Sequence, residues 1–161
     1  MLTRILTGSL ALGLLLPILL RADDAQKNLD KDLDGKWEGA SWISDGEELK
    51  EGFVILLVEK DKFTLTTGTR ITLLDDGKER QVEDSDTVKG TIKADLKSSP
   101  KAIDFTWREG TGKGKTNRSI YEIKGDVLRF CTSGVEKDRP TEFSSKKGSG
   151  LMIVVLKRAK K

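Results

Sequence analysis

The stretch of sequence that decides the fold is Lys101–Lys157, which reads KAIDFTWREGTGKGKTNRSIYEIKGDVLRFCTSGVEKDRPTEFSSKKGSGLMIVVLK. It contains four short alternating or apolar runs, separated by Gly, Lys and Pro residues. Runs of this length between turn residues are typical of antiparallel strands. The stretch therefore predicts the part of the chain that closes a small sheet or barrel.

The chain upstream predicts four more strands, at 35–43, 53–59, 63–67 and 88–96. About eight strands joined by hairpins predict an all-β fold, a small up-and-down antiparallel β-barrel. In the first strand, alternation places Trp37 and Trp42 on opposite faces, and we expect Trp37 to be the buried one. Residues 75–86 are almost all charged or polar, which predicts a surface loop or an exposed hairpin turning at Asp75, Asp76 and Gly77.

The amino-acid composition limits the catalytic and metal-binding chemistry that the chain can perform. The chain has no His, so it lacks the commonest general base and the commonest transition-metal ligand. Its single cysteine, Cys131, allows no intrachain disulfide and no thiolate zinc cluster. The formal charge is +3, and Arg4 and Arg21 in the leader contribute two of these charges. The remaining +1 does not indicate a nucleic-acid partner, which needs a clustered basic face.

The first residues predict a targeting segment. Arg4 precedes an apolar run from Leu10 to Leu20, and Ala22 is a candidate cleavage position. We expect a signal peptide at 1–22, or an uncleaved anchor, then a polar lead-in at 23–34 and a barrel domain at 35–158. The expected location is periplasmic or extracellular, with membrane contact only through an uncleaved leader.

Two motifs suggest ligand sites and fail on spacing. Asp30, Asp32 and Asp34 open like a calcium loop, but the twelfth position holds Ser41 instead of a bidentate Glu. The run at 110–116, GTGKGKT, resembles a phosphate loop, but Glu109 stands where the first Gly is required. We therefore predict no metal site and no cofactor, an acidic lead-in at the first motif and a Gly-rich turn at the second.

The chain resembles a lipocalin-like domain family, as yet uncharacterised, of secreted planctomycete proteins. The residues that carry the resemblance are KAID at 101–104, GKGK at 112–115, IYEIKGDVLRFC at 120–131, RPTEFSSKKGSG at 139–150, VLKR at 155–158 and LDGKWEG at 33–39. Residues 70–86 depart from the family pattern as an insertion. The resemblance implies a lipocalin-like barrel and an exported protein, and it brings no substrate or catalytic residue with it.

Three functions remain open at this stage. The first is a non-enzymatic binding module for a small apolar or amphipathic ligand, because an eight-stranded barrel can hold one small ligand or be filled by its own side chains. The second is an envelope or extracellular protein-interaction or structural domain with a filled core. The third is a carboxylate-based hydrolase, which would need two convergent acids, whereas Asp104 and Glu122 are expected on outward faces.

The candidate site residues follow from the first of these functions. The expected ligand lining is aromatic and consists of Trp37, Phe105, Trp107, Tyr121 and Phe130. The expected rim lies in the loop before the last strand, where Arg139, Thr141 and Glu142 surround Pro140. The same rim residues could instead form an ion pair that fixes the loop to the barrel. We predict no catalytic residue.

Overall fold

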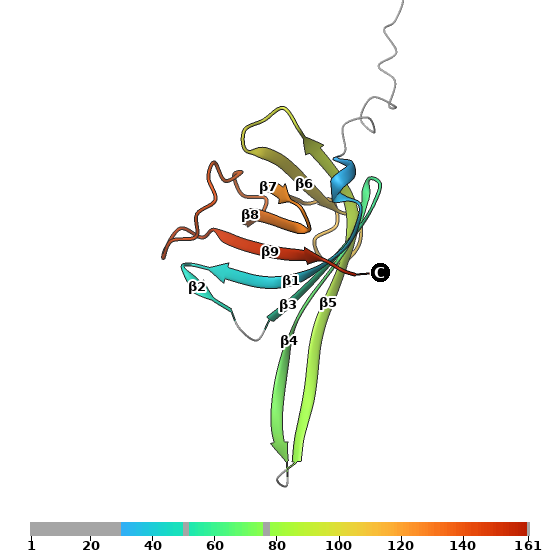
Figure 1. Ribbon diagram of the computed structural model, residues 1–161, viewed down its shortest axis with the longest axis vertical. Helices are drawn as coiled ribbons and strands as arrows, with labels where there is room; N and C mark the ends of the chain where they lie inside the picture. Colours follow the sequence, from blue (N-terminus) through green and yellow to red (C-terminus); the bar gives the residue numbers. More distant parts are fainter. Residues whose placement is uncertain (1–29, 50–51, 76–77, 161) are drawn as a thin grey trace, which may run out of the picture.

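The computed structural model of the protein describes residues 30–49, 52–75 and 78–160. A single sheet with the order β2-β1-β3-β4-β5-β6-β7-β8-β9 closes on itself because β1 also pairs with β9. All neighbours are antiparallel, and β2 is an extra strand beside β1, so the predicted all-β, up-and-down barrel of eight strands is confirmed (Figure 1). The strands are β1 Gly35–Ser44, β2 Glu47–Glu48, β3 Gly52–Glu59, β4 Lys62–Asp75, β5 Lys78–Asp95, β6 Lys101–Trp107, β7 Thr116–Lys124, β8 Val127–Val135 and β9 Met152–Arg158.

A short 3-10 turn, η2 (Lys31–Leu33), leads into β1 at one end of the barrel. Trp37 is fully buried, as predicted, and its indole N–H donates to the Leu33 carbonyl at 2.8 Å. The guanidinium of Arg158, at the end of β9, lies 4.1 Å from the centre of the Trp37 ring and donates to the carbonyls of Asp32 and Asp34. The first and last strands are thus tied together at this end, which we call the closed end.

The face assignment along β1 was wrong beyond Gly39. The pairing with β9 passes from Gly39↔Leu156 to Ser41↔Val155, so the strand holds one extra residue there, a β-bulge. One extra residue exchanges the faces of everything that follows. Trp42 therefore packs against the main core together with Trp37, whereas Ile43 joins a second apolar cluster.

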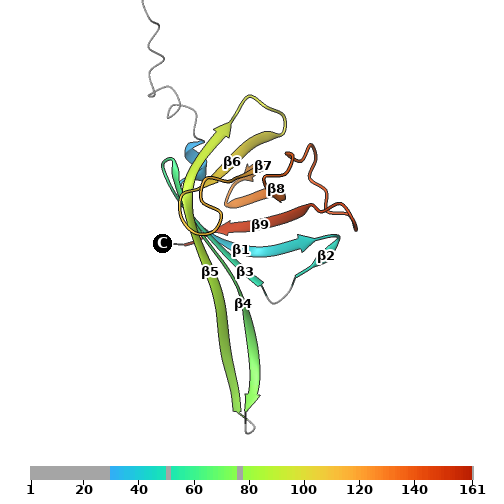
Figure 2. The ribbon, with the colours of Figure 1, turned by 180° about the vertical axis from the view of Figure 1, so that it is seen from behind.

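The polar segment after β4 forms a hairpin, one of the two predicted states. β4 and β5 pair from Lys62↔Thr91 to Asp75↔Lys78, and the tip at 76–77 lies outside the described residues. β3 pairs with β4 only as far as Thr69, and β6 pairs with β5 only from Gly90 onward. The part beyond these limits, Arg70–Asp75 with Lys78–Glu83, is named the ribbon here, and it projects away from the barrel (Figures 1 and 2).

The segment between β8 and β9, residues 136–151, is named the strap. It packs against the outer face of the barrel, because β7, β8 and β9 carry apolar side chains on both faces. Ile120, Cys131 and Ile153 are buried there beneath Phe143 and Leu151 of the strap. A barrel wall that is apolar outside as well as inside needs such a cover to keep these side chains from water.

Candidate functional site

The five predicted lining residues form a packed interior. Trp37 and Tyr121 are fully buried, and Phe105, Trp107 and Phe130 are at most 9% exposed. Phe63 meets two of these rings edge-on, with ring centres 5.1 Å from Phe105 and 6.3 Å from Trp107. The space found among Phe105, Trp107 and Phe130 measures about 30 Å³, far below the usual size of a small-molecule site. These positions act as core in the folded chain.

The predicted rim residues divide into one structural clamp and two exposed side chains. Arg139 donates to the carbonyls of Ser119 at 2.6 Å and Ile103 at 3.2 Å, and it pairs with the Asp104 carboxylate at 2.6 Å. Thr141 and Glu142 are exposed. The ion pair that fixes the loop to the barrel is present, but the partner of Arg139 is Asp104 on β6.

The acidic lead-in closes one end of the barrel. Asp30 caps η2 and is 8% exposed, and its carboxylate accepts from Lys101 Nζ at 2.8 Å and from the Tyr121 hydroxyl at 3.1 Å. Burial acts to raise the pKa of Asp30, but the hydrogen bonds from Lys101, the Asp32 amide and Tyr121 outweigh it and hold that pKa below its usual value. Burial, with the neighbouring Asp30 carboxylate, raises the pKa of Tyr121.

The acidic motif therefore serves as a plug. The Asp34 carboxylate accepts from the Lys60 amide at 2.8 Å, which ties the lead-in to the β3–β4 turn. Within the described ranges, no group of three or more His, Cys, Asp or Glu side chains has the arrangement of a metal site.

The acids considered for hydrolysis are held in separate ion pairs. Asp104 is bound by Arg139, and Glu122 pairs with Lys124 at 3.0 Å and Arg129 at 3.4 Å. The hydrogen bond from Lys124 is the main cause that lowers the pKa of Glu122. Each carboxylate thus has its own basic partner, so these two acids do not form a convergent pair.

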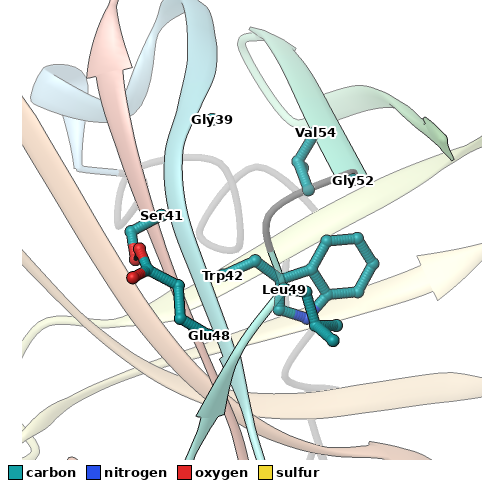
Figure 3. A pocket seen from close by; sticks show the side chains of 7 residues that line it. All are labelled: Gly39, Ser41, Trp42, Glu48, Leu49, Gly52 and Val54. Carbon is teal, nitrogen blue, oxygen red and sulfur yellow. Dashed lines mark hydrogen bonds between the residues drawn. The ribbon is translucent and has the colours of Figure 1, made fainter. Parts of the chain in front are cut away.

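A groove that the sequence did not reveal lies between β1, β2, β3 and β4. Asp45 and Gly46 both have positive φ, 54° and 84°, so they form the two-residue turn that favours Asp-Gly in hairpins. This turn folds β2 back along β1, and the Leu49 amide donates to the Trp42 carbonyl at 2.8 Å. Leu49 is brought beside Trp42 in this way (Figure 3).

The strap holds this hairpin in place. The Ser145 hydroxyl donates to the Leu151 carbonyl at 2.8 Å and accepts from the Gly46 amide at 3.3 Å. The Gly150 amide in turn donates to the Asp45 carboxylate at 3.3 Å. Contacts from the strap therefore fix both residues of the turn that positions Leu49.

The groove consists of two adjoining hollows, of about 240 and 600 Å³. Both share Trp42 and Leu49, and their full lining is Gly39, Ser41, Trp42, Glu48, Leu49, Gly52, Val54, Thr67, Gly68 and Thr69. We call it the Trp42 groove. Gly52 leaves room for the indole, since a Cβ there would lie 3.3 Å from the Trp42 ring. The larger hollow falls in the usual size range of small-molecule sites.

Polarity in the groove is unevenly distributed. The Ser41 hydroxyl donates to the Glu48 carboxylate at 2.9 Å, and Figure 3 shows this carboxylate turned toward Ser41, away from the indole. The indole nitrogen of Trp42 is buried and has no hydrogen-bond partner among the residues that the structure describes. A buried donor without an acceptor costs about 1–3 kcal/mol.

Comparisons with protein-family models, with curated proteins and with solved structures gave no match to this chain. Over the described residues, none of the helical segments has the length and apolar character needed to cross a membrane.

Proposed function

We propose that this protein is an exported, non-enzymatic binding module that holds a small amphipathic ligand in the Trp42 groove. The observation that carries the proposal is the buried, unpartnered indole N–H of Trp42 at an apolar hollow of about 600 Å³. A neutral ligand with a carbonyl or hydroxyl oxygen would accept this hydrogen bond while its apolar body covers Trp42 and Leu49. Leu49 is 44% exposed, so a ligand would remove apolar surface from water.

This proposal places the ligand outside the barrel interior, where the aromatic residues already fill the space. Glu47 and Glu48 near the groove disfavour an anionic ligand. Export is supported by Arg4 and the apolar run from Leu10 to Leu20. The resemblance to a lipocalin-like family of secreted proteins fits the same proposal and remains a prediction.

The test is a titration with Nile red, a neutral apolar dye that carries a carbonyl acceptor. We expect its emission to rise and to shift to shorter wavelength on binding. Leu49→Asp places a charge on the apolar wall and should weaken the affinity about tenfold or more. Leu96→Asp is the matched control, since Leu96 is 39% exposed and lies in the β5–β6 connection, and it should leave the affinity unchanged.

Trp42→Phe separates the hydrogen bond from the apolar contact. It keeps a ring in the groove, removes the N–H donor and should weaken Nile red binding about fivefold. Absence of dye binding to the folded protein, or equal losses in Leu49→Asp and Leu96→Asp, would refute the proposal.

A second candidate function is a protein-interaction domain on a solid barrel. It is favoured by the ribbon, which extends beyond β3 and β6 and carries charged residues on both strands. Here the envelope or extracellular partner would contact the ribbon, and dye binding in the groove would be unnecessary.

A further inference from the structure

The ribbon leaves one edge of β5 without a neighbouring strand. β6 pairs with β5 from Gly90 onward, and the Arg108 amide donates to the Lys89 carbonyl at 2.8 Å. Between Lys78 and Val88, β5 is paired with β4 alone among the strands that the structure describes. Figures 1 and 2 show this edge clear of the barrel from both sides.

Such an edge is a template for another strand. Alternate peptide groups of β5 point away from β4 there, and an exposed row of N–H and C=O groups readily pairs with a second chain. A two-stranded hairpin is also only marginally stable by itself in water, and independent stability needs three or more strands with an apolar face. The ribbon would gain from a partner strand.

We propose that the partner is a second copy of this chain, whose β5 pairs antiparallel with this β5 around a two-fold axis at Val82. The edge of β5 runs Lys78, Glu79, Arg80, Gln81, Val82, Glu83, Asp84, Ser85, Asp86. Basic residues precede Val82 and acidic residues follow it at matching distances. With Val82 opposite its own copy, Arg80 stands opposite Asp84 and Lys78 stands opposite Asp86.

The two-fold axis makes each of these opposite-charge pairs occur twice. The remaining positions are also compatible, because Glu79 stands opposite Ser85 and Gln81 opposite Glu83. Opposite charges across antiparallel strands are stabilising, and like charges directly opposite are destabilising. The edge is therefore complementary to itself in this register.

Neighbouring registers lack this property. Hydrogen bonding along an antiparallel pair alternates, so two copies of one strand can slide only by two residues at a time. Sliding one way puts Glu79 opposite Glu83, and sliding the other way puts Glu83 opposite its own copy. A parallel, in-register pair would set every charge opposite itself. Only the register centred on Val82 avoids like charges among these.

The first test is sedimentation equilibrium of the purified protein and of charge-exchange variants. We expect a monomer–dimer equilibrium for the native sequence between about 1 and 500 μM. Arg80→Asp sets two carboxylates opposite each other at both ends and should weaken the dimer about tenfold or more. The double variant Arg80→Asp with Asp84→Arg restores opposite charges and should recover the native dimer within about threefold.

Lys113→Asp makes the same change in net charge on the exposed β6–β7 connection and should leave dimerisation unchanged. A protein that stays monomeric over the whole concentration range would overturn the proposal. A dimer that Arg80→Asp does not weaken, or that the double variant does not recover, would overturn it equally.

The second test reads the register directly. Cα atoms of directly opposite residues in an antiparallel pair are about 4.5–5.5 Å apart, within the span of a disulfide. Val82→Cys should therefore form a disulfide dimer under mild oxidation, whereas Gln81→Cys, displaced from its own copy, should form much less. The native Cys131 is buried and provides the background. Equal cross-linking of both variants would refute the register.

The proposed dimer goes beyond the proposed function and does not depend on it, because the variants of both tests leave the Trp42 groove intact.

Discussion

Replacing Arg139 with Ala distinguishes a structural clamp from a recognition residue. The side chain makes three hydrogen bonds, to the carbonyls of Ser119 and Ile103 and to the Asp104 carboxylate. Hydrogen bonds from a charged donor contribute about 1.5–3 kcal/mol each when buried. The side chains of Arg139 and Asp104 are 31% and 30% exposed, so water compensates for part of the loss. We expect Arg139→Ala to lower the free energy of unfolding by about 2 kcal/mol, a shift of about 1 M in the urea midpoint.

The strap also carries a local reporter of the same change. Cys131 is fully buried, and its thiol donates to the Ser144 carbonyl at 3.5 Å. Burial raises the pKa of the Cys131 thiol, which keeps it unreactive. If release of the strap limits access to Cys131, a loss of 2 kcal/mol should raise the rate of its reaction with an aromatic disulfide reagent about thirtyfold.

Thr141→Ala and Glu142→Ala are the controls within the strap. Both residues are exposed, and neither side chain forms a hydrogen bond or ion pair with the described residues, so both variants should keep native stability and a protected Cys131. An Arg139→Ala variant with unchanged unfolding and unchanged thiol reactivity would refute the clamp.

Two further predictions concern the ends of the barrel and its tight interior. The Asp30 carboxylate has a pKa held below its usual 3.8. Its contribution to the free energy of unfolding is therefore present above that pH and is lost as the pH falls through the lower pKa of the folded state. Urea unfolding should show Asp30→Asn destabilised by about 1–2 kcal/mol at pH 7, with the difference shrinking in acid; an equal difference at both pH values would contradict this. Gly90 packs so closely that an added Cβ would overlap the Thr106 carbonyl and the Phe63 ring. Gly90→Ala should therefore cost about 1–3 kcal/mol in urea unfolding, whereas Gly112→Ala, which meets only ordinary contacts, should cost less than about 1 kcal/mol; equal losses would be inconsistent with the packing.

The sequence predicted the strands well because alternation and turn residues are local properties. The runs around Phe105, Tyr121 and Phe130 fell on the faces expected of them, and Asp75 to Gly77 marked the hairpin that β4 and β5 form. The reversal of faces after Gly39 was missed, because a bulge depends on the pairing with β9 and leaves no mark in the alternation. The extra residue in this bulge sets the face on which Trp42 lies, and Trp42 in turn lines the groove.

The division between core and lining could not be predicted from residue types. The aromatic residues suited to a cavity wall are also those that fill a solid barrel, and only the distances between Phe63, Phe105 and Trp107 distinguish the two. The partner of Arg139 was equally hidden, because Asp104 lies thirty-five positions away in sequence. The available signals for the groove were the Asp45-Gly46 turn and Gly52, which together allow β2 to fold beside Trp42.

The conspicuous run at 139–150 illustrates why a distinctive sequence does not by itself indicate chemistry. Arg139 binds two carbonyls and a carboxylate of the wall, Phe143 covers Cys131, and Ser145 holds the Asp45-Gly46 turn. Each of these contacts needs a particular side chain at a particular distance, which is enough to explain the pattern without a ligand. For the proposed ligand binding, the strap has an indirect role, because the hairpin that it fixes carries Leu49. Weakening the Ser145 contacts should disturb dye binding at the Trp42 groove although Ser145 does not line it.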